Sequence, residues 1–205
     1  MAVTTDSGKP ADEKYSKILK LMVDEPTNYD KIMYSAAFEG HIDIVKLMLE
    51  KGANDYKRVM KNAASKGHID IVKLMLEKGA NNYQSAMNNA AQGGYIDIVK
   101  LMMENGAVNY SWTMSFTARG KALQGRTSAG HVDIVKLLLE KGAYNYNSVM
   151  FTAAMNGHID IVRLMLEKGA NEYSRVLKSI EKDKYTDIVQ LLQDHQTNLV
   201  TPQTQ

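Results

Sequence analysis

Histidine or tyrosine recurs at one position of a repeated sequence, and imidazole nitrogen is the commonest metal ligand in proteins. Equivalent residues on stacked helices are expected about 8–10 Å apart, whereas zinc requires nitrogens at about 2.0–2.1 Å from the metal. We therefore predict no metal site. A structural role is favoured instead, in which each imidazole hydrogen-bonds across the turn between two helices. The position is occupied by His41, His68, Tyr95, His131, His158 and Tyr185.

The segment Gly120–Thr127, GKALQGRT, comes close to the phosphate-binding loop GxxxxGK[ST]. Arg126 stands where that loop has lysine, and a planar guanidinium does not reproduce a compact ammonium group. The motif also requires a strand before it and a helix after it, whereas both flanks here carry helical patterns. We expect neither a nucleotide nor any other cofactor at this segment.

Aspartate also recurs, and paired carboxylates could serve as general acid and general base. Each aspartate falls in the first turn of a predicted helix, where the helix dipole stabilises a negative charge. That structural role accounts for Asp43, Asp70, Asp97, Asp133 and Asp160. The chain has no cysteine, which excludes thiol catalysis, disulfides and zinc–thiolate sites. No catalytic constellation emerges, and we expect the protein not to be an enzyme.

The 205 residues carry 25 basic and 23 acidic side chains, for a net charge of +2. Nucleic-acid-binding chains typically have basic residues in clustered excess, so this balance does not indicate one. The N-terminal MAVTTDSGKP lacks the apolar stretch of a signal peptide, and no apolar run reaches the length of about 18 residues that spans a membrane. We therefore expect a cytoplasmic protein.

A longer repeat contains these residues. The stretch GHIDIVKLMLEKGAN occupies 40–54 and returns unchanged at 67–81. A tyrosine marks each copy at intervals of 27 residues, with one interval of 36: Tyr29, Tyr56, Tyr83, Tyr110, Tyr146 and Tyr173. Such a period is typical of solenoids. The predicted organisation is a disordered tail at 1–13, a capping half-repeat at 14–28, six repeats at 29–55, 56–82, 83–109, 110–145, 146–172 and 173–199, and a tail at 200–205. The fourth repeat carries a nine-residue insertion at about 121–129, and the sixth is predicted to be a C-terminal cap.

Each repeat contains two helical patterns. The first begins at the tyrosine and is apolar at positions 1, 4, 5, 8 and 9, which form one face of a helix. The second is apolar around most of its circumference and requires cover on several sides, as in a stacked solenoid. The tyrosine and methionine positions are predicted to be core. N-caps of the first helices are predicted at Asn28, Asp55, Asn82, Asn109 and Asn145. Left-handed residues ending the second helices are predicted at Gly52, Gly79, Gly106, Gly142 and Gly169.

The run AAxxGHIDIVKLMLEKGAN resembles the ankyrin repeat, and the resemblance covers most of the chain. It implies an all-α, ankyrin-like helical-repeat solenoid and a function in binding partner proteins. The period of 27 is shorter than the family's period of about 33, and Tyr-x-x-Val-Met replaces the Thr-Pro-Leu-His opening. The missing residues fall where the family has its β-hairpin finger, so we expect shortened or absent fingers. Compact arrays of this kind are similar to those abundant in giant viruses and amoeba-associated microbes, for which the compartment would be the host cytoplasm.

The first helices differ between repeats at positions 2, 3, 6, 7 and 10, while the second helices are nearly copies. Positions 3, 6, 7 and 10 lie opposite the apolar positions, where structure alone requires only polar residues. Several are aromatic instead, as expected of an interface anchor. The alternative is sequence drift, with the rings folded over the helix edge. The predicted partner-binding residues, which include basic residues near the insertion, are Tyr34, Phe38, Lys61, Asn88, Trp112, Phe116, Arg119, Lys121, Arg126, Phe151 and Met155.

Three functions follow as hypotheses. The first is a monomeric, non-catalytic scaffold that binds an unidentified protein through the first-helix face and the insertion, with neither nucleic acid nor membrane as partner. The alternative is a binder of polyanions, nucleic acid or nucleotide, along a basic track at Lys57, Arg58, Lys61, Lys66, Arg119, Lys121 and Arg126. The third is an enzyme that uses the insertion loop. Salt dependence separates the first two, because phosphate contacts weaken steeply as salt rises.

Overall fold

The computed structural model describes residues 13–24, 27–120 and 129–200. Within these ranges the chain forms thirteen helices and no strand. The helices are α1 Glu13–Asp24, α2 Tyr29–Glu39, α3 Ile42–Glu50, α4 Tyr56–Lys66, α5 Ile69–Glu77, α6 Tyr83–Gln92, α7 Ile96–Glu104, α8 Tyr110–Arg119, α9 Ala129–Glu140, α10 Tyr146–Met155, α11 Ile159–Glu167, α12 Tyr173–Ser179 and α13 Thr186–Val200. The predicted all-α class is confirmed. Residues 51–55 alone join α3 to α4, so the place of the family's finger holds a short loop.

The first helix of each repeat begins at the tyrosine that marks the repeat, as predicted. Five of the second helices begin directly after the recurrent histidine or tyrosine. In the fourth repeat the second helix, α9, begins earlier, at Ala129, and contains His131. The helix therefore includes Ala129, the last residue of the predicted insertion. Residues 121–128 of the predicted insertion, like both predicted tails apart from Glu13 and Val200, lie outside the described residues.

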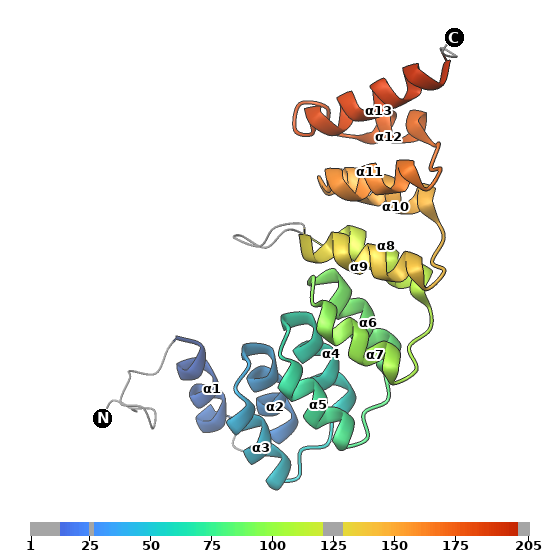
Figure 1. Cartoon of the computed structure of the whole chain (residues 1–205). Helices are drawn as coiled ribbons and strands as arrows, with labels where there is room; N and C mark the ends of the chain where they lie inside the picture. Colours follow the sequence, from blue (N-terminus) through green and yellow to red (C-terminus); the bar gives the residue numbers. More distant parts are fainter. Residues whose placement is uncertain (1–12, 25–26, 121–128, 201–205) are drawn as a thin grey trace. The chain divides into compact units, whose positions relative to one another are not determined.

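Two compact units divide the chain at residue 86, within α6. In the first unit α1 packs on α2, α2 packs on α3 and α4, and α4 packs on α5. In the second unit α8 packs on α9 and α10, α10 packs on α11 and α12, and α11 packs on α13. Figure 1 shows these helix pairs layered within each unit. Each pair contacts its neighbours along the chain, which is the contact pattern of a solenoid.

The core of each layer is formed by the first-helix positions that were predicted to be apolar. Methionine at position 5 is fully buried in five repeats, at Met33, Met60, Met87, Met114 and Met150. The alanine pair that follows is also fully buried, as at Ala63 and Ala64, and its small side chains allow neighbouring helices to approach closely. The tyrosines at position 1 are half-buried rather than core, because the phenol group is amphipathic and its hydroxyl stays in contact with water.

Side-chain N-caps form at Asn28, Asp55 and Asn109. Their oxygens accept the backbone N–H three residues ahead at 3.2, 3.3 and 3.1 Å, respectively. Asn145 was predicted to do the same and does not, since its backbone is left-handed at φ 79° and ψ 34° and its side chain makes no capping bond. Asparagine is one of the few residues that tolerate this conformation, which differs from the extended backbone of an ordinary N-cap.

Asn82 makes a different contact from the one predicted for an N-cap. Its amide Nδ2 donates to the backbone carbonyl of Lys57 at 2.9 Å and so links the loop to the preceding first helix. The glycines at the ends of the second helices agree with the prediction, with φ between 84° and 104° at Gly52, Gly79, Gly106, Gly142 and Gly169. A left-handed residue there ends the helix and costs glycine no steric strain.

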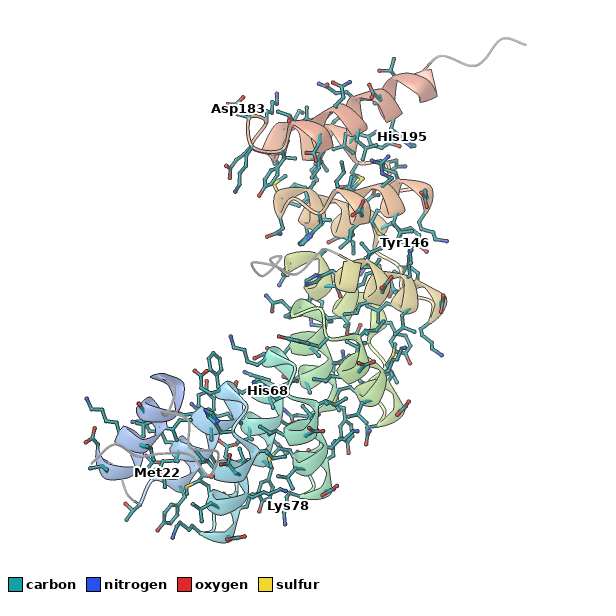
Figure 2. The ribbon with its side chains drawn as sticks, turned by 60° about the vertical axis from the view of Figure 1, so that its left-hand side comes forward. Met22, His68, Lys78, Tyr146, Asp183 and His195 are labelled. Atoms are coloured by element: carbon teal, nitrogen blue, oxygen red, sulfur yellow. The ribbon has the colours of Figure 1, made fainter. Side chains whose placement is uncertain are left out.

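The last repeat departs from the others in its first helix. Helix α12 is seven residues long, and Ile180 and Glu181 follow it where four of the five earlier repeats have two buried alanines. Ile180 is buried and Glu181 is exposed. Figure 2 places Asp183 in the turn before α13 and His195 further along that helix. The assignment of 173–199 as a C-terminal cap stays a prediction.

Candidate partner-binding surface

Three of the four recurrent histidines bind backbone carbonyls of the preceding repeat. Nε2 of His68 lies 3.2 Å from the carbonyl oxygen of Phe38, and Nε2 of His131 lies 2.9 Å from that of Gln92. His158 makes the same bond to Gly120. A carbonyl can only accept, so Nε2 carries the proton in each case. These bonds satisfy carbonyls at or near the ends of first helices, which lack a helical partner. The predicted structural role is confirmed at these three histidines, with the difference that the bond joins two repeats; within the described ranges, Nε2 of His41 makes no such bond.

The rings of His131 and His158 lie 5.5 Å apart between centroids. This is closer than the expected 8–10 Å, because that distance separates helix axes and the side chains extend into the gap between them. In the described ranges no group of three or more His, Cys, Asp or Glu side chains could hold a metal ion. Burial lowers the pKa of His158 below its usual value of 6.5, and the charge of His131 lowers it further, against an opposing effect of the Gly120 carbonyl. Burial of the ring therefore favours the neutral form of His158.

Glycine at the preceding turn allows these rings to approach the backbone. A Cβ added to Gly40 would lie 2.5 Å from Cε1 of His68, and one added to Gly157 would lie 2.6 Å from Cε1 of Tyr185. Both glycines also have positive φ, of 89° and 78°. Figure 2 places His68 at the end of α5 opposite to Lys78, and thus at the turn between the two helices of its repeat. Histidine and tyrosine therefore fill equivalent places against a glycine.

Of the segment that resembles a phosphate-binding loop, only Gly120 lies among the described residues. Its backbone has φ −58° and ψ 128°, and its carbonyl accepts the bond from His158. The remaining residues of the segment, Arg126 among them, lie outside the described ranges.

A role of repeat position 2 was missed in the sequence analysis. Asp30 Oδ1 accepts the backbone N–H groups of Asn54 and Asp55 at 2.8 and 2.9 Å. The equivalent Asn147 Oδ1 accepts those of Asn171 and Glu172 at 2.7 and 3.2 Å. These side chains hold the loop that leads to the next repeat. The short acceptor side chains Asp, Asn and Ser at this position were the available signal, and Ser111 also accepts an N–H, from Tyr144, at 3.0 Å.

In the first unit the predicted aromatic residues lie beneath basic side chains of the next repeat. The guanidinium carbon of Arg58 lies 4.3 Å from the ring centroid of Tyr34. Nζ of Lys66 lies 4.2 Å from the ring centroid of Phe38, which is 38% exposed. Lys61 is exposed on the same helix as Arg58 and Lys66. Cations over ring faces at such distances are attracted by the ring quadrupole.

In the second unit Trp112 is 50% exposed. Its ring packs edge-on against Phe116 with centroids 5.7 Å apart, which confirms the contact expected from their spacing of four residues. The guanidinium carbon of the exposed Arg119 lies 5.3 Å from the Phe116 ring centroid. The three residues, of which Phe116 is half-buried, form one cluster on α8, named here the Trp112 cluster.

Phe151 and Met155 are half-buried on α10, the first helix that packs beside α8. The guanidinium carbon of Arg175 lies 4.7 Å from the Phe151 ring centroid, and the same guanidinium is 3.0 Å from Glu172. Phe151 and Arg175 occupy the same repeat positions as Tyr34 and Arg58, 24 residues apart in both cases. That recurrent spacing could have revealed the contact in the sequence.

Asn88 was predicted on the exposed face and is buried, at 7% exposure. Its Oδ1 accepts the hydroxyl proton of Thr113 at 2.7 Å. Asn62 and Ser115 at positions 7 and 6 are buried as well, so these positions also pack at the boundary between adjacent first helices. Asn88 is therefore removed from the candidate surface, while Lys121 and Arg126 lie outside the described residues.

The comparisons with known proteins agree with this architecture. A family described as "Ankyrin repeats (3 copies)" matches 32–111, 60–148 and 117–176. No curated protein matches the chain. The crystal structure of the human ASB11 ankyrin repeat domain matches with a TM-score of 0.61 and 20% sequence identity, over 80% of this chain and 82% of that chain. Among the described helices, none has both the length and the apolar character needed to cross a membrane. Since the family matches together extend over residues 32–176, which is more than half of the chain, the chain belongs to the ankyrin repeat family.

Proposed function

We propose that the chain is a non-catalytic scaffold that binds a partner protein through the exposed face of its first helices. Ankyrin repeats are generally protein–protein interaction modules, and the family is typically non-catalytic. The Trp112 cluster carries the proposal. An exposed tryptophan packs on a second ring, Phe116, and Arg119 lies over that second ring. Tryptophan and arginine are enriched in binding hot spots. Tyr34, Phe38, Lys61, Phe151 and Met155 complete the proposed surface within their own units.

The insertion is included in the proposed surface on the grounds of its sequence. Insertions in solenoids fall in loops that often lie on the binding side, and this one follows Arg119 at the end of α8. Lys121 and Arg126 would add positive charge to the same place. We also propose a monomeric, intracellular protein; the absence of cysteine from a chain of this size supports the intracellular part of the proposal.

The experiment compares two double variants in capture of partners from cells of the source organism. The test variant, Trp112→Ala/Phe116→Ala, removes the rings of the Trp112 cluster. The control variant, Val108→Ala/Tyr144→Ala, removes two exposed apolar side chains of the same unit, 70% and 66% exposed, that lie outside the first helices. Truncation of an interface anchor typically costs about 2 kcal/mol or more of binding. A partner retained by the control and lost by the test variant, with both circular dichroism spectra unchanged, supports the proposal. Equal retention by both variants contradicts it.

A further inference from the structure

Helix α4 of the first unit carries an unbalanced positive charge. Its sequence, YKRVMKNAASK, contains no acidic residue, and its basic side chains are all exposed, at Lys57, Arg58, Lys61 and Lys66. Lys61 follows Lys57 by four residues and Arg58 by three, so these like charges are neighbours on the helix surface and weaken the helix. A stable helix does not require this arrangement.

The second helices of the same chain show the opposite arrangement. In five of them a central basic residue has Asp three positions before it and Glu four positions after it, as Lys46 has Asp43 and Glu50. Charges of opposite sign at these spacings stabilise a helix. This pairing of opposite charges is therefore repeated in nearly identical form on the second helices, and it is absent from α4.

Aromatic rings, rather than carboxylates, hold two of the α4 cations. Arg58 lies over Tyr34 and Lys66 over Phe38, both on the adjacent helix α2. A ring orients a cation and leaves its full charge available to an anion. The nearby Asp30 carboxylate is occupied by two backbone N–H groups.

Two further acidic residues lie close to this surface. Asp55 caps α4 through the N–H of Arg58, and Glu39 is the last residue of α2. Together with Asp30 they give three acidic side chains against the four basic side chains of α4. Asp30 lies in the first turn of α2 and Asp55 directly before α4, so neither aspartate lies along the exposed face.

We infer that this face of α2 and α4 binds an acidic segment of the partner protein, rich in Asp or Glu. The inference rests on the proposed function and names the chemistry of the partner at one part of the surface. Carboxylates of the segment would pair with Arg58, Lys61 and Lys66, and charge complementarity of this kind provides specificity and speeds association.

A protein segment fits this face better than a nucleic acid. Single-stranded nucleic acids are bound largely by stacking of bases on exposed aromatic faces, and here the faces of Tyr34 and Phe38 are already covered by Arg58 and Lys66. The net charge of the whole chain, +2, is also far below that of typical polyanion binders.

The test uses the full chain and a fluorescently labelled oligo-glutamate peptide, with an oligo-glutamine peptide of equal length and a single-stranded oligothymidine as comparators. Binding is measured by fluorescence anisotropy. The face variant is Arg58→Gln/Lys61→Gln/Lys66→Gln. The matched control, Lys46→Gln/Lys73→Gln/Lys78→Gln, removes three exposed charges from α3, α5 and the turn after α5 in the same unit.

Binding of oligo-glutamate and not of oligo-glutamine is expected. Loss of three exposed ion pairs should raise the Kd about tenfold in the face variant, with little change in the control, and rising salt should weaken wild-type binding. Absence of oligo-glutamate binding overturns the inference, as does an equal loss in both variants. Tighter binding of oligothymidine than of oligo-glutamate also overturns it, in favour of a polyanion site.

The two proposals fail separately. Capture of a partner that depends on Trp112 and Phe116, without any oligo-glutamate binding, leaves the scaffold function standing and overturns the acidic segment. Oligo-glutamate binding that is lost in the face variant, without a partner that depends on the Trp112 cluster, supports the α4 face and contradicts the proposed surface on α8.

Discussion

Arg175 lies over the Phe151 ring of the preceding repeat, with its guanidinium carbon 4.7 Å from the ring centroid. Arg58 and Tyr34 form the same contact at 4.3 Å in the first unit. In both pairs the ring is at position 6 of one repeat and the arginine at position 3 of the next. The contact therefore joins consecutive first helices on their exposed side, whereas the buried methionines and alanines join them in the core.

The pair Phe151 and Arg175 should contribute to the stability of the second unit. We expect a double-mutant cycle with Phe151→Leu and Arg175→Gln to give a coupling energy of about 0.5–1 kcal/mol in the free energy of unfolding, measured with urea. A control cycle pairs Phe151→Leu with Lys178→Gln, which changes another exposed basic residue of α12. Equal coupling in the two cycles would mean that the ring contact contributes nothing specific.

Substitution of Gly40 should destabilise the protein more than the same substitution of Gly52. Both glycines have positive φ, of 89° and 98°, so alanine carries a similar backbone strain of about 1–2 kcal/mol at either site. At Gly40 the added Cβ also meets the His68 ring, while at Gly52 nothing lies within 4 Å. Urea unfolding gives the loss in the free energy of unfolding for Gly40→Ala and for Gly52→Ala. The difference between the two losses measures the cost of the clash between the added Cβ and the His68 ring. Adding His68→Ala to Gly40→Ala should reduce that cost. Identical losses at the two glycines would contradict the close packing of His68.

The burial of His158 should make stability depend on pH. Its pKa is lowered in the folded state below the usual 6.5, so the unfolded chain binds a proton at a higher pH than the folded chain does. The resulting stabilisation is complete above pH 6.5 and is lost as pH falls through that value toward the lowered pKa. The slope from this group is at most about 1.4 kcal/mol per pH unit.

Urea unfolding of the wild type and of His158→Gln checks this expectation. The measurements run from about pH 7.5 to about pH 5, roughly half a pH unit apart, and so cover the titration range of histidine. The variant should show a smaller loss of stability with falling pH. Because His131 lies against His158, His131→Gln serves as the second comparison. Parallel curves for the wild type and His158→Gln would show that the folded and unfolded pKa values of His158 are equal.

The repeat period and the cap residues were sufficient to predict the helices. The tyrosine that opens each first helix and the glycine that ends five of the second helices are local signals, and local signals do not depend on the neighbouring repeat. Asn145 shows where this fails, because the choice between a capping and a left-handed asparagine depends on how the loop meets the preceding helix.

The candidate surface was predictable only in part. Trp112 and Phe116 share one helix face, and their contact follows from their spacing. The burial of Asn88 does not follow from the pattern of one helix, because Thr113 belongs to the next repeat. The cations over Tyr34 and Phe151 could be found only by comparing positions across consecutive repeats.

The Asp30 contact should be maintained by asparagine and lost with alanine. Asp30 accepts two backbone N–H groups of the loop before α4, and Asn147 makes the same pair of bonds before α12. Asp30→Asn should therefore change the free energy of unfolding little, while Asp30→Ala leaves two loop donors without this acceptor and should cost about 1–3 kcal/mol. Hydrogen exchange at Asn54 and Asp55 gives a local readout, and it should accelerate only in Asp30→Ala.

Lys57→Ala is the control at the same position of the next repeat. There the bond to Asn82 uses the backbone carbonyl of Lys57, which the substitution keeps. Unchanged exchange at Asn54 and Asp55 in Asp30→Ala would show that the loop holds its conformation without the carboxylate.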